Sequence, residues 1–392
     1  MTSLPINVDP LRIAGLLAVA ILTASALCQE KVQPQVTVDL KALGSTPDLF
    51  TDQSDSMYQQ RGVIHAFWLG NDRVAVAFST NRRWTNTGAP QPLSVHLLIF
   101  DSAGKRLKER DWSFSGDGPE GSMTLNLAPG PGDSILAVYD AHSPGPIPDG
   151  DYVQVLNADT SLRQIFYIPA TSAWVPSINP EPELVLESYF ADKRSSLTWW
   201  SGNPLKPGVK LDLPVGKDET LAGPAGLAAR ADCANPILCF GVRVYRSEKT
   251  IWNYSLPHPE IVPIPRLFLS STALLVEQRD LDESQSELLV IHPTGPPTPL
   301  PVIPHGLQVV GATGVSSDGR RFAVTGSGEA GICGIFNLWC NQRTETLVID
   351  VPTNRIIFQQ GISPAGGTSS LSPDGKHLAI FDRNKLAIYS LP

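Results

Sequence analysis

The sequence predicts an all-β protein, a seven-bladed β-propeller whose last blade is closed by an N-terminal strand. Three observations lead to this fold class. The 392 residues include 32 glycines and 35 prolines, which suit many short strands joined by turns and suit long helices badly. A turn followed by an apolar strand recurs about every 50 residues, the length of a four-stranded blade. The last repeat has only three strands, and an unassigned strand stands near the start of the chain.

The N-terminal segment has the pattern of a secretory signal peptide. The apolar run Ile13–Leu22 follows Arg12 and leads to an A-x-A cleavage signal that ends at Ala26. This run is shorter than the roughly 20 apolar residues that a membrane-spanning helix requires. The expected organisation is therefore a signal peptide at 1–26, a linker at 27–33 and the propeller at 34–392.

Two alternatives concern this same segment. An uncleaved membrane anchor is favoured by the weak positive charge ahead of the apolar run, where Asp9 offsets Arg12. A lipoprotein signal at Cys28 fits less well, because Leu27 occupies the position where a small residue is expected.

The cysteines also indicate an oxidising compartment. Cys28 lies at the signal junction, and the other four form two local pairs, Cys233 with Cys239 and Cys333 with Cys340. In an exported chain such pairs predict two short-range disulfides. A zinc site is the competing interpretation, but these spacings are not those of zinc knuckles and no histidine lies close by in sequence. The protein is therefore expected to be secreted or periplasmic.

The predicted strands follow in order along the chain. The turn centres of the seven blades are predicted at residues 71, 132, 182, 235, 271, 318 and 374. The first three blades are predicted at Val63–Phe67, Val74–Ser79, Ser94–Phe100 and Arg106–Phe114, then at Ser122–Leu127, Ile135–Tyr139, Tyr152–Leu156 and Arg163–Ile168, then at Ala173–Ile178, Leu184–Tyr189, Ser195–Trp200 and Val209–Leu213. The fourth blade, over Leu221–Ser255, is the least regular, and Glu287–Ile291 and Thr346–Ile349 are third strands of the fifth and sixth.

The end of the chain gives the topology of the seventh blade. Thr368–Leu371, Leu378–Phe381 and Leu386–Tyr389 are three predicted strands with no fourth after them, which would leave an exposed sheet edge. Gln35–Leu40 alternates in hydrophobicity and belongs to no other blade. We expect it to pair with the last strand and close the ring. A pair of β-sandwiches is the alternative all-β arrangement, and the repeat length and this ending favour the propeller.

Two turn-and-strand units carry a family resemblance. Ser372–Ile380 reads SPDGKHLAI, and Ser316–Val324 reads SSDGRRFAV. Both resemble the S-P-D-G-[KR]-x-[LF]-A repeat of TolB-like and WD40-like β-propellers. The resemblance implies that each turn joins the first and second strands of a blade, and that partners in the cell envelope would be proteins. No Trp-Asp or Gly-His pair occurs in the chain, which favours the TolB-like group.

Composition and motifs exclude several functions. A net charge of -8 and a pI near 5.4 argue against a nucleic-acid partner. The chain has no G-x-S-x-G elbow, no H-E-x-x-H and no P-loop, and its seven histidines show no metal-ligand spacing. Gly326–Gly331 matches G-x-G-x-x-G by letter but does not open a helix. The acidic stretches at 52–55 and 280–283 lack the calcium-loop pattern, so no catalytic, cofactor or metal residues are predicted.

Long connections mark a candidate binding face. In propellers, the connections between second and third strands emerge on the same face as those between blades. Here the long ones are Thr80–Leu93, Asp140–Asp151, Asp280–Ser286 and Gly326–Arg343. The candidate binding residues on them are Arg82, Arg83, Trp84, His142, Asp280, Phe336 and Trp339. The alternative is that these side chains cover loop backbone and pack locally.

The expected function is that of an exported, monomeric binding or protein-interaction module with a protein or glycan partner, touching a membrane only through an uncleaved signal anchor. The rivals are an exported enzyme (a lactonase, lyase or glycan hydrolase) with its site at the mouth of the central channel, and a structural envelope protein. Three or more His, Asp or Glu side chains meeting in the channel would favour the enzyme. A channel lined by small and apolar residues would favour binding or scaffolding.

Overall fold

The computed structural model divides into two units, Met1–Gln33 and Pro34–Pro392, and only the second contains regular structure that is described here. The described residues are 32–44, 64–80, 93–114, 125–141, 150–169, 172–175, 181–190, 195–213, 220–235, 238–247, 249–256, 261–280, 286–304, 307–330, 341–363 and 367–392. The predicted signal peptide therefore lies outside them. Within these ranges no helix is long and apolar enough to cross a membrane.

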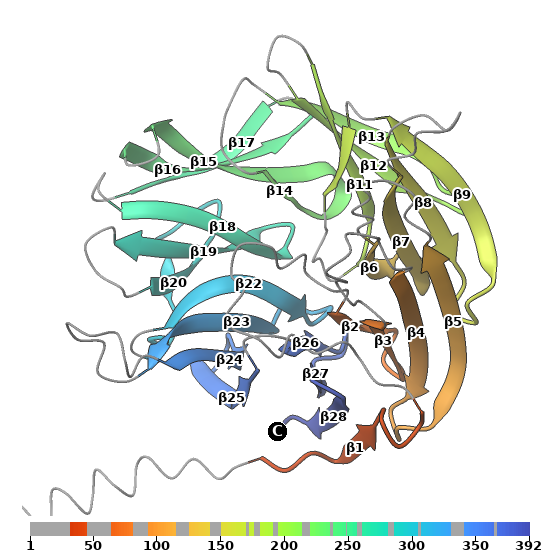
Figure 1. The fold of residues 1–392 in the computed structure, drawn as a ribbon. Helices are drawn as coiled ribbons and strands as arrows, with labels where there is room; N and C mark the ends of the chain where they lie inside the picture. The colour runs from red at the N-terminus through yellow and green to blue at the C-terminus, as the bar shows by residue number, and fades with distance from the viewer. Residues whose placement is uncertain are drawn as a thin grey trace, which may run out of the picture. The chain divides into compact units, whose positions relative to one another are not determined.

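The second unit is an all-β, seven-bladed propeller, as predicted (Figure 1). Each blade is a four-stranded antiparallel sheet. The first three blades are β2 (Ile64–Leu69), β3 (Arg73–Thr80), β4 (Leu93–Asp101) and β5 (Arg106–Phe114); β6 (Leu125–Gly130), β7 (Ser134–Ala141), β8 (Gly150–Leu156) and β9 (Leu162–Pro169); and β10 (Ser172–Val175), β11 (Leu184–Tyr189), β12 (Ser195–Ser201) and β13 (Lys206–Leu213). From the fourth blade round to the second, the first strands of neighbouring blades contact each other, and β2 touches both β6 and the first strand of the seventh blade.

The other four blades follow the same order. They are β14 (Leu221–Ala222), β15 (Leu227–Asn235), β16 (Leu238–Arg246) and β17 (Lys249–Ser255); β18 (Ile261–Ser270), β19 (Ala273–Asp280), β20 (Ser286–Ile291) and β21 (Thr298–Pro299); β22 (Leu307–Val315), β23 (Arg321–Ala330), β24 (Asn341–Asp350) and β25 (Arg355–Ile362); and β26 (Gly367–Leu371), β27 (His377–Asp382), β28 (Lys385–Ser390) and β1 (Val36–Asp39). The predicted third strands of the fifth and sixth blades are confirmed as β20 and β24.

The predicted ring closure is confirmed. β1 pairs antiparallel with β28, from Val36 opposite Ile388 to Asp39 opposite Lys385. The backbone N–H of Leu40 donates to the Asn384 carbonyl at 2.9 Å, and the Leu40 side chain is fully buried. Strand β1 therefore supplies the fourth strand of a blade whose other three strands end the chain.

The placement of one turn was wrong. The turn predicted at residue 235 joins the second and third strands of the fourth blade, β15 and β16, whereas the first and second strands are joined by Pro224–Gly226. The first strand, β14, has only two residues and so gives no apolar run to recognise. With the turn centre at 225, its distances along the chain from the turn centres at 182 and 271 are nearly equal. The predicted centre at 235 was much closer to 271 than to 182.

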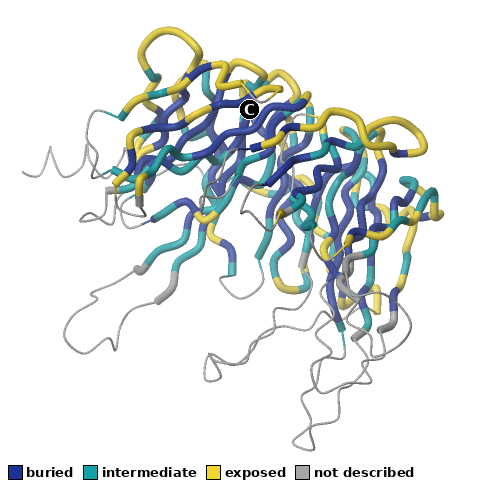
Figure 2. The backbone as a smooth tube through the Cα atoms, turned by 90° about the horizontal axis from the view of Figure 1, so that it is seen from above, coloured by how far each residue is buried: buried dark blue, intermediate teal, exposed yellow. Residues whose placement is uncertain are grey.

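The core lies between neighbouring sheets. The first and seventh blades pack through Phe78, Phe100 and Phe381, all fully buried. Both faces of each sheet are covered in this way, so the six central residues of β3, Val74–Ser79, are all buried rather than alternating. Burying one such side chain stabilises the fold by roughly 1.5–3 kcal/mol. Figure 2 shows the result, with buried strands ending in exposed turns.

Candidate functional site

The propeller presents two faces. We call the side that carries the turns between first and second strands and between third and fourth strands the turn face, and the opposite side the connection face. The turns of the turn face are short, such as Gly70–Asp72 between β2 and β3 and Pro131–Asp133 between β6 and β7. The connection face carries the segments that join second to third strands. Three of these, at 81–92, 142–149 and 331–340, are long and lie outside the described ranges, whereas those of the fourth and seventh blades, at 236–237 and 383–384, are tight.

The two S-x-D-G turns have one hydrogen-bond pattern. In the seventh blade, the Ser372 hydroxyl donates to the Asp374 carboxylate at 2.6 Å, and the Lys376 N–H donates to the same oxygen at 3.0 Å. In the sixth blade, Ser316 and Asp318 make the same contacts at 2.7 and 3.0 Å. Both turns join first and second strands, as the resemblance implied. The sequence repeat is therefore a repeat of side-chain-to-backbone hydrogen bonds.

These turns also bond to their neighbours. The Ser317 N–H of the sixth blade donates to the Pro373 carbonyl of the seventh at 2.6 Å. The Asp374 N–H in turn donates to the Asn71 side chain of the first blade at 2.9 Å. Arg73 of the first blade pairs with Asp133 of the second at 3.2 Å. Direct contacts thus link four consecutive blades along the turn face.

Glu183 makes a similar link between the third and fourth blades. Its carboxylate accepts a hydrogen bond from the backbone N–H of Ala225, in the turn that follows β14. Burial raises the pKa of Glu183 to about 7, the Ala225 bond opposes that rise, and the charge of Glu181 adds to it. Among the described residues, the Oε2 atom of Glu183 has no hydrogen-bond partner. This carboxyl group therefore changes charge near neutral pH.

The sequence predicted binding residues in the segments that follow second strands of the blades. Asp280 ends strand β19, where its backbone pairs with Ile261. The remaining predicted residues, Arg82, Arg83, Trp84, His142, Phe336 and Trp339, lie outside the described residues. What the structure does show is that the strands leading to them, β3, β7, β19 and β23, end on this one face.

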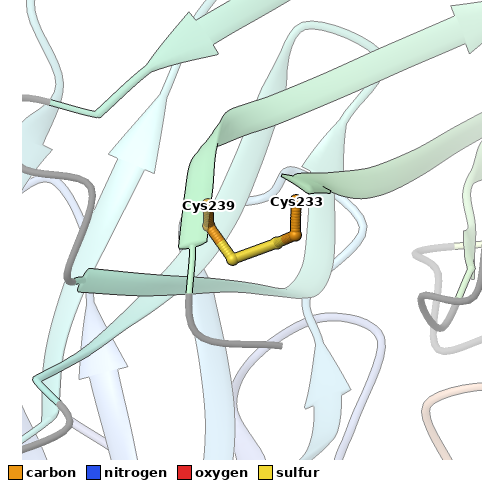
Figure 3. The surroundings of a disulfide bond; sticks show 2 residues. All are labelled: Cys233 and Cys239. Carbon is orange, nitrogen blue, oxygen red and sulfur yellow. A yellow bond between two sulfur atoms is a disulfide. The ribbon is translucent and has the colours of Figure 1, made fainter. Parts of the chain in front are cut away.

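The fourth blade closes its connection differently. The predicted Cys233–Cys239 disulfide is present and joins the ends of β15 and β16 (Figure 3). Next to it, Leu238 and Phe240 are exposed on β16. The other predicted pair, Cys333 and Cys340, lies outside the described residues. The described disulfide therefore fixes one short connection on this face.

A three-residue hydrogen-bond chain crosses the first blade near the connection face. Asp111 on β5 accepts from Nδ1–H of His96 on β4 at 2.7 Å, and Nε2 of His96 lies 2.8 Å from Oγ1 of Thr80 on β3. Asp111 is well exposed, whereas His96 is mostly covered. Because Thr80 is the last residue before the connection to β4, this chain fixes the point from which that connection leaves the sheet.

Two buried charge clusters were not predicted. Glu277 on β19 is fully buried and bonds to Arg266, Arg279 and the Ser286 hydroxyl. Arg266 also donates to the Val309 carbonyl of the sixth blade at 2.7 Å. At the equivalent place in the third blade, Glu187 pairs with Arg230 of the fourth blade. In the sequence, each glutamate directly follows an apolar run, Ala273–Val276 before Glu277 and Leu184–Leu186 before Glu187. A carboxylate buried there requires bonded partners.

A cavity of about 310 Å³ occupies the central channel towards the turn face. It is lined from five first strands, β2, β6, β10, β22 and β26, and by two prolines of neighbouring turns, Pro182 and Pro373. Most of its lining is small, apolar or aromatic, including Trp68 and Trp174. The five strands that form this cavity are far apart in the chain, so no local sequence pattern predicts it.

Among the described lining residues, His65 is the one ionisable side chain. Burial lowers the pKa of His65 to about 4, and a hydrogen bond to the Leu125 carbonyl acts in the opposite direction. The imidazole is therefore neutral at physiological pH. The described part of the chain contains no group of three His, Cys, Asp or Glu residues placed to hold a metal ion.

Comparisons with known proteins give structural neighbours at low identity. No protein-family model and no curated protein sequence matches the chain. The solved structures to which it is similar include a chain of the mitotic checkpoint complex, with 10% identity, 100% of this chain and 99% of that chain covered, and a TM-score of 0.48. They also include the C-terminal WD40 domain of Sif2 (9% identity, 92% and 99% covered, TM-score 0.40) and an oligogalacturonate lyase in complex with manganese (9%, 85% and 97%, 0.43).

These neighbours include binding domains and an enzyme, and at such identities they carry no inference about what this chain binds or does. The chain is thus a β-propeller with WD40-like structural neighbours.

Proposed function

We propose that the protein is an exported binding module, secreted or periplasmic and of the TolB-like kind, that recognises a protein partner through its connection face. The observation that carries this proposal is the difference between the two faces. Most turns of the turn face are short and several bond to one another, whereas three of the segments that follow second strands, at 81–92, 142–149 and 331–340, are longer. Loops held by a rigid scaffold are where binding residues are most often found.

The lining of the channel supports binding over catalysis. An enzyme of the hydrolase or lyase classes would need converging acids, bases or metal ligands. The described lining brings one neutral imidazole together with small and aromatic groups. The buried carboxylates are bonded to arginines instead: Glu277 pairs with Arg266 and Arg279 within the fifth blade, and Glu187 pairs with Arg230 of the fourth blade. Binding is therefore the function that the described geometry supports best.

The test compares two triple variants in a pull-down from an envelope extract. Changing Arg82, Arg83 and Trp84 to alanine removes two cationic and one aromatic side chain from the connection face. The matched control changes Lys105, Arg106 and Leu107, which are exposed on the third-to-fourth turn and the following strand of the first blade. We expect partner recovery to fall at least tenfold in the first variant and to stay at the wild-type level in the control. Equal recovery from both would count against the connection face.

Export is tested separately. N-terminal sequencing of the protein from the periplasm or medium should begin at Leu27, and a chain that retains residues 1–26 in the membrane fraction would instead favour the uncleaved anchor.

A further inference from the structure

One hydrogen-bond chain in the first blade joins a hydroxyl, an imidazole and a carboxylate. Oγ1 of Thr80 on β3 lies 2.8 Å from Nε2 of His96 on β4, and Nδ1 of the same ring lies 2.7 Å from the Asp111 carboxylate on β5. These three groups in this order are the parts of a nucleophilic triad, which is recognised by its geometry whatever the chain order. None of the three is among the described residues that line the channel cavity, and the inference below does not rest on the proposed binding role.

The bond to Asp111 sets where the ring of His96 carries its proton. A carboxylate accepts hydrogen bonds, so Nδ1 of the neutral imidazole carries the proton and Nε2 offers its lone pair. The Thr80 hydroxyl therefore donates to Nε2. In this state the imidazole can remove the hydroxyl proton as a general base.

The register of the sheet holds the three side chains on one face. His96 stands directly opposite Phe78 on β3 and Asp111 on β5. Thr80 follows Phe78 by two residues and so projects from the same face. The buried Phe78 ring packs against the imidazole, with the ring centroids 5.5 Å apart. The His96 ring is therefore positioned by both a core side chain and a carboxylate.

Solvent reaches this chain of groups. The Asp111 side chain is 63% exposed and the His96 side chain 28% exposed, and Thr80 is partly exposed at the end of β3. Because a developing charge is stabilised only weakly where water is present, exposed groups do little to help a poor leaving group depart. The substrates that fit are esters whose alcohol leaves readily, as a phenolate does from an aryl ester.

We propose that Thr80 and His96 hydrolyse aryl esters of small carboxylic acids, with Asp111 as the positioning residue. Nε2 of His96 takes the hydroxyl proton while Oγ1 of Thr80 bonds to the ester carbonyl carbon. The bond from that carbon to the phenolic oxygen then breaks, and the proton passes from His96 to the departing phenol. A water molecule next attacks the acyl-threonine with His96 again as the base, which releases the carboxylic acid and returns the proton to Oγ1.

The experiment uses the full chain and p-nitrophenyl acetate. Nitrophenol release is followed by absorbance, and protein quenched in acid during turnover is analysed by peptide mass spectrometry. We expect saturable hydrolysis and an acetyl group on Thr80. Thr80→Val keeps the side-chain shape and should reduce hydrolysis to the rate in buffer, whereas Thr80→Ser should stay within about threefold of the wild type. His96→Gln should lower kcat about 100-fold.

Two further variants separate catalysis from packing and from the reactivity of any surface imidazole. Asp111→Asn should lower kcat about tenfold and leave KM unchanged, a division that a loss of folded protein would not produce in this form. His292→Gln is the control and should keep wild-type kinetics, because His292 contacts the Thr272 carbonyl rather than a carboxylate. Thermal melts identify a variant that does not fold, and the site of acetylation in the wild-type chain is then the deciding result.

Three results would overturn the proposal: hydrolysis no faster than in buffer, an acetyl group on a residue other than Thr80, or equal kinetics in Thr80→Val and the wild type.

Discussion

On the turn face, the ends of neighbouring blades touch and bond, from the Ser317–Pro373 contact of the sixth and seventh blades to the Arg73–Asp133 pair of the first and second. On the side of the connection face, the described contacts between blades include the Ser363 N–H bond to Asp382, the Arg266 bond to the Val309 carbonyl and the Glu187–Arg230 pair. Hydrogen bonds and ion pairs between blades therefore lie both along the turn face and within the ring.

The largest effect is expected from removing the closing strand. Deleting residues 27–41 uncovers β28 and exposes the core around Leu40, so the seventh blade loses its fourth strand and the ring loses its closure. We expect the second unit to lose cooperative unfolding, or to melt well below the wild-type temperature, in differential scanning calorimetry. The control deletes only 27–33, which precedes β1. If both deletions melt with the wild-type protein, the closing strand does not hold the ring.

The second-largest loss of stability is expected from removing the buried charge of Glu277. Glu277→Ala leaves Arg266 and Arg279 without their carboxylate in the interior, and breaking such a pair destabilises a fold by about 3–5 kcal/mol. The matched control is Glu109→Ala, since Glu109 pairs with Arg106 on the surface, where an ion pair contributes about 0–1 kcal/mol. Urea unfolding measures both. Similar losses in the two variants would show that the Glu277 cluster does not join the blades.

A clash between two turns should have a smaller effect. A Cβ at Gly319 would lie 2.3 Å from the Leu269 carbonyl of the fifth blade, and its φ of +69° is left-handed. We expect Gly319→Ala to destabilise the protein by roughly 1–3 kcal/mol through overpacking, in addition to the backbone strain. Gly132→Ala isolates the strain, because its φ is +61° and no atom lies within 4 Å. The melting temperature should fall more in Gly319→Ala than in Gly132→Ala. Equal falls would mean that the close approach of Gly319 to Leu269 does not affect stability.

The smallest effects are expected in the pH dependence of stability. They involve Glu183, which links two blades on the turn face, and His65, which lines the channel cavity. Glu183 has a raised pKa, so the stability it contributes is full below pH 4.5 and is lost as the pH rises to about 7. His65 has a lowered pKa, so its contribution is present above pH 6.5 and is lost as the pH falls to about 4. Glu183→Gln should therefore make stability rise more steeply with pH between 4.5 and 7.

His65→Gln should make it rise less steeply between 4 and 6.5. Urea midpoints measured from pH 4 to 7.5 give both slopes. Unchanged slopes in both variants would contradict the assigned environments of these two groups.

Much of the fold could be predicted because its signals are local. The S-x-D-G turns repeat the same hydrogen bonds and so repeat in letters, and the alternation of Gln35–Leu40 reveals a strand in need of a partner. The turn of the fourth blade could not be found in this way, because the two residues of β14 leave no pattern.

The channel was beyond sequence reasoning for a different reason. His65 and Trp174 meet there only because five first strands, spread from β2 to β26, converge on one axis. Glu277 directly follows the apolar run Ala273–Val276, which indicates a buried strand, but its two arginine partners are a property of the fold. The sequence predicted the binding residues of the connection face by loop length and residue type, and these stay predictions.

Site-specific photo-crosslinking in the producing cell tests the central claim most directly. A photoreactive residue is placed at Trp84 on the connection face in one variant and at Leu107, exposed on β5 close to its turn, in another. We predict a discrete crosslinked adduct at position 84 and none at position 107. Adducts at 107 alone, or equal adducts at both positions, would contradict the proposal that the connection face is the recognition surface.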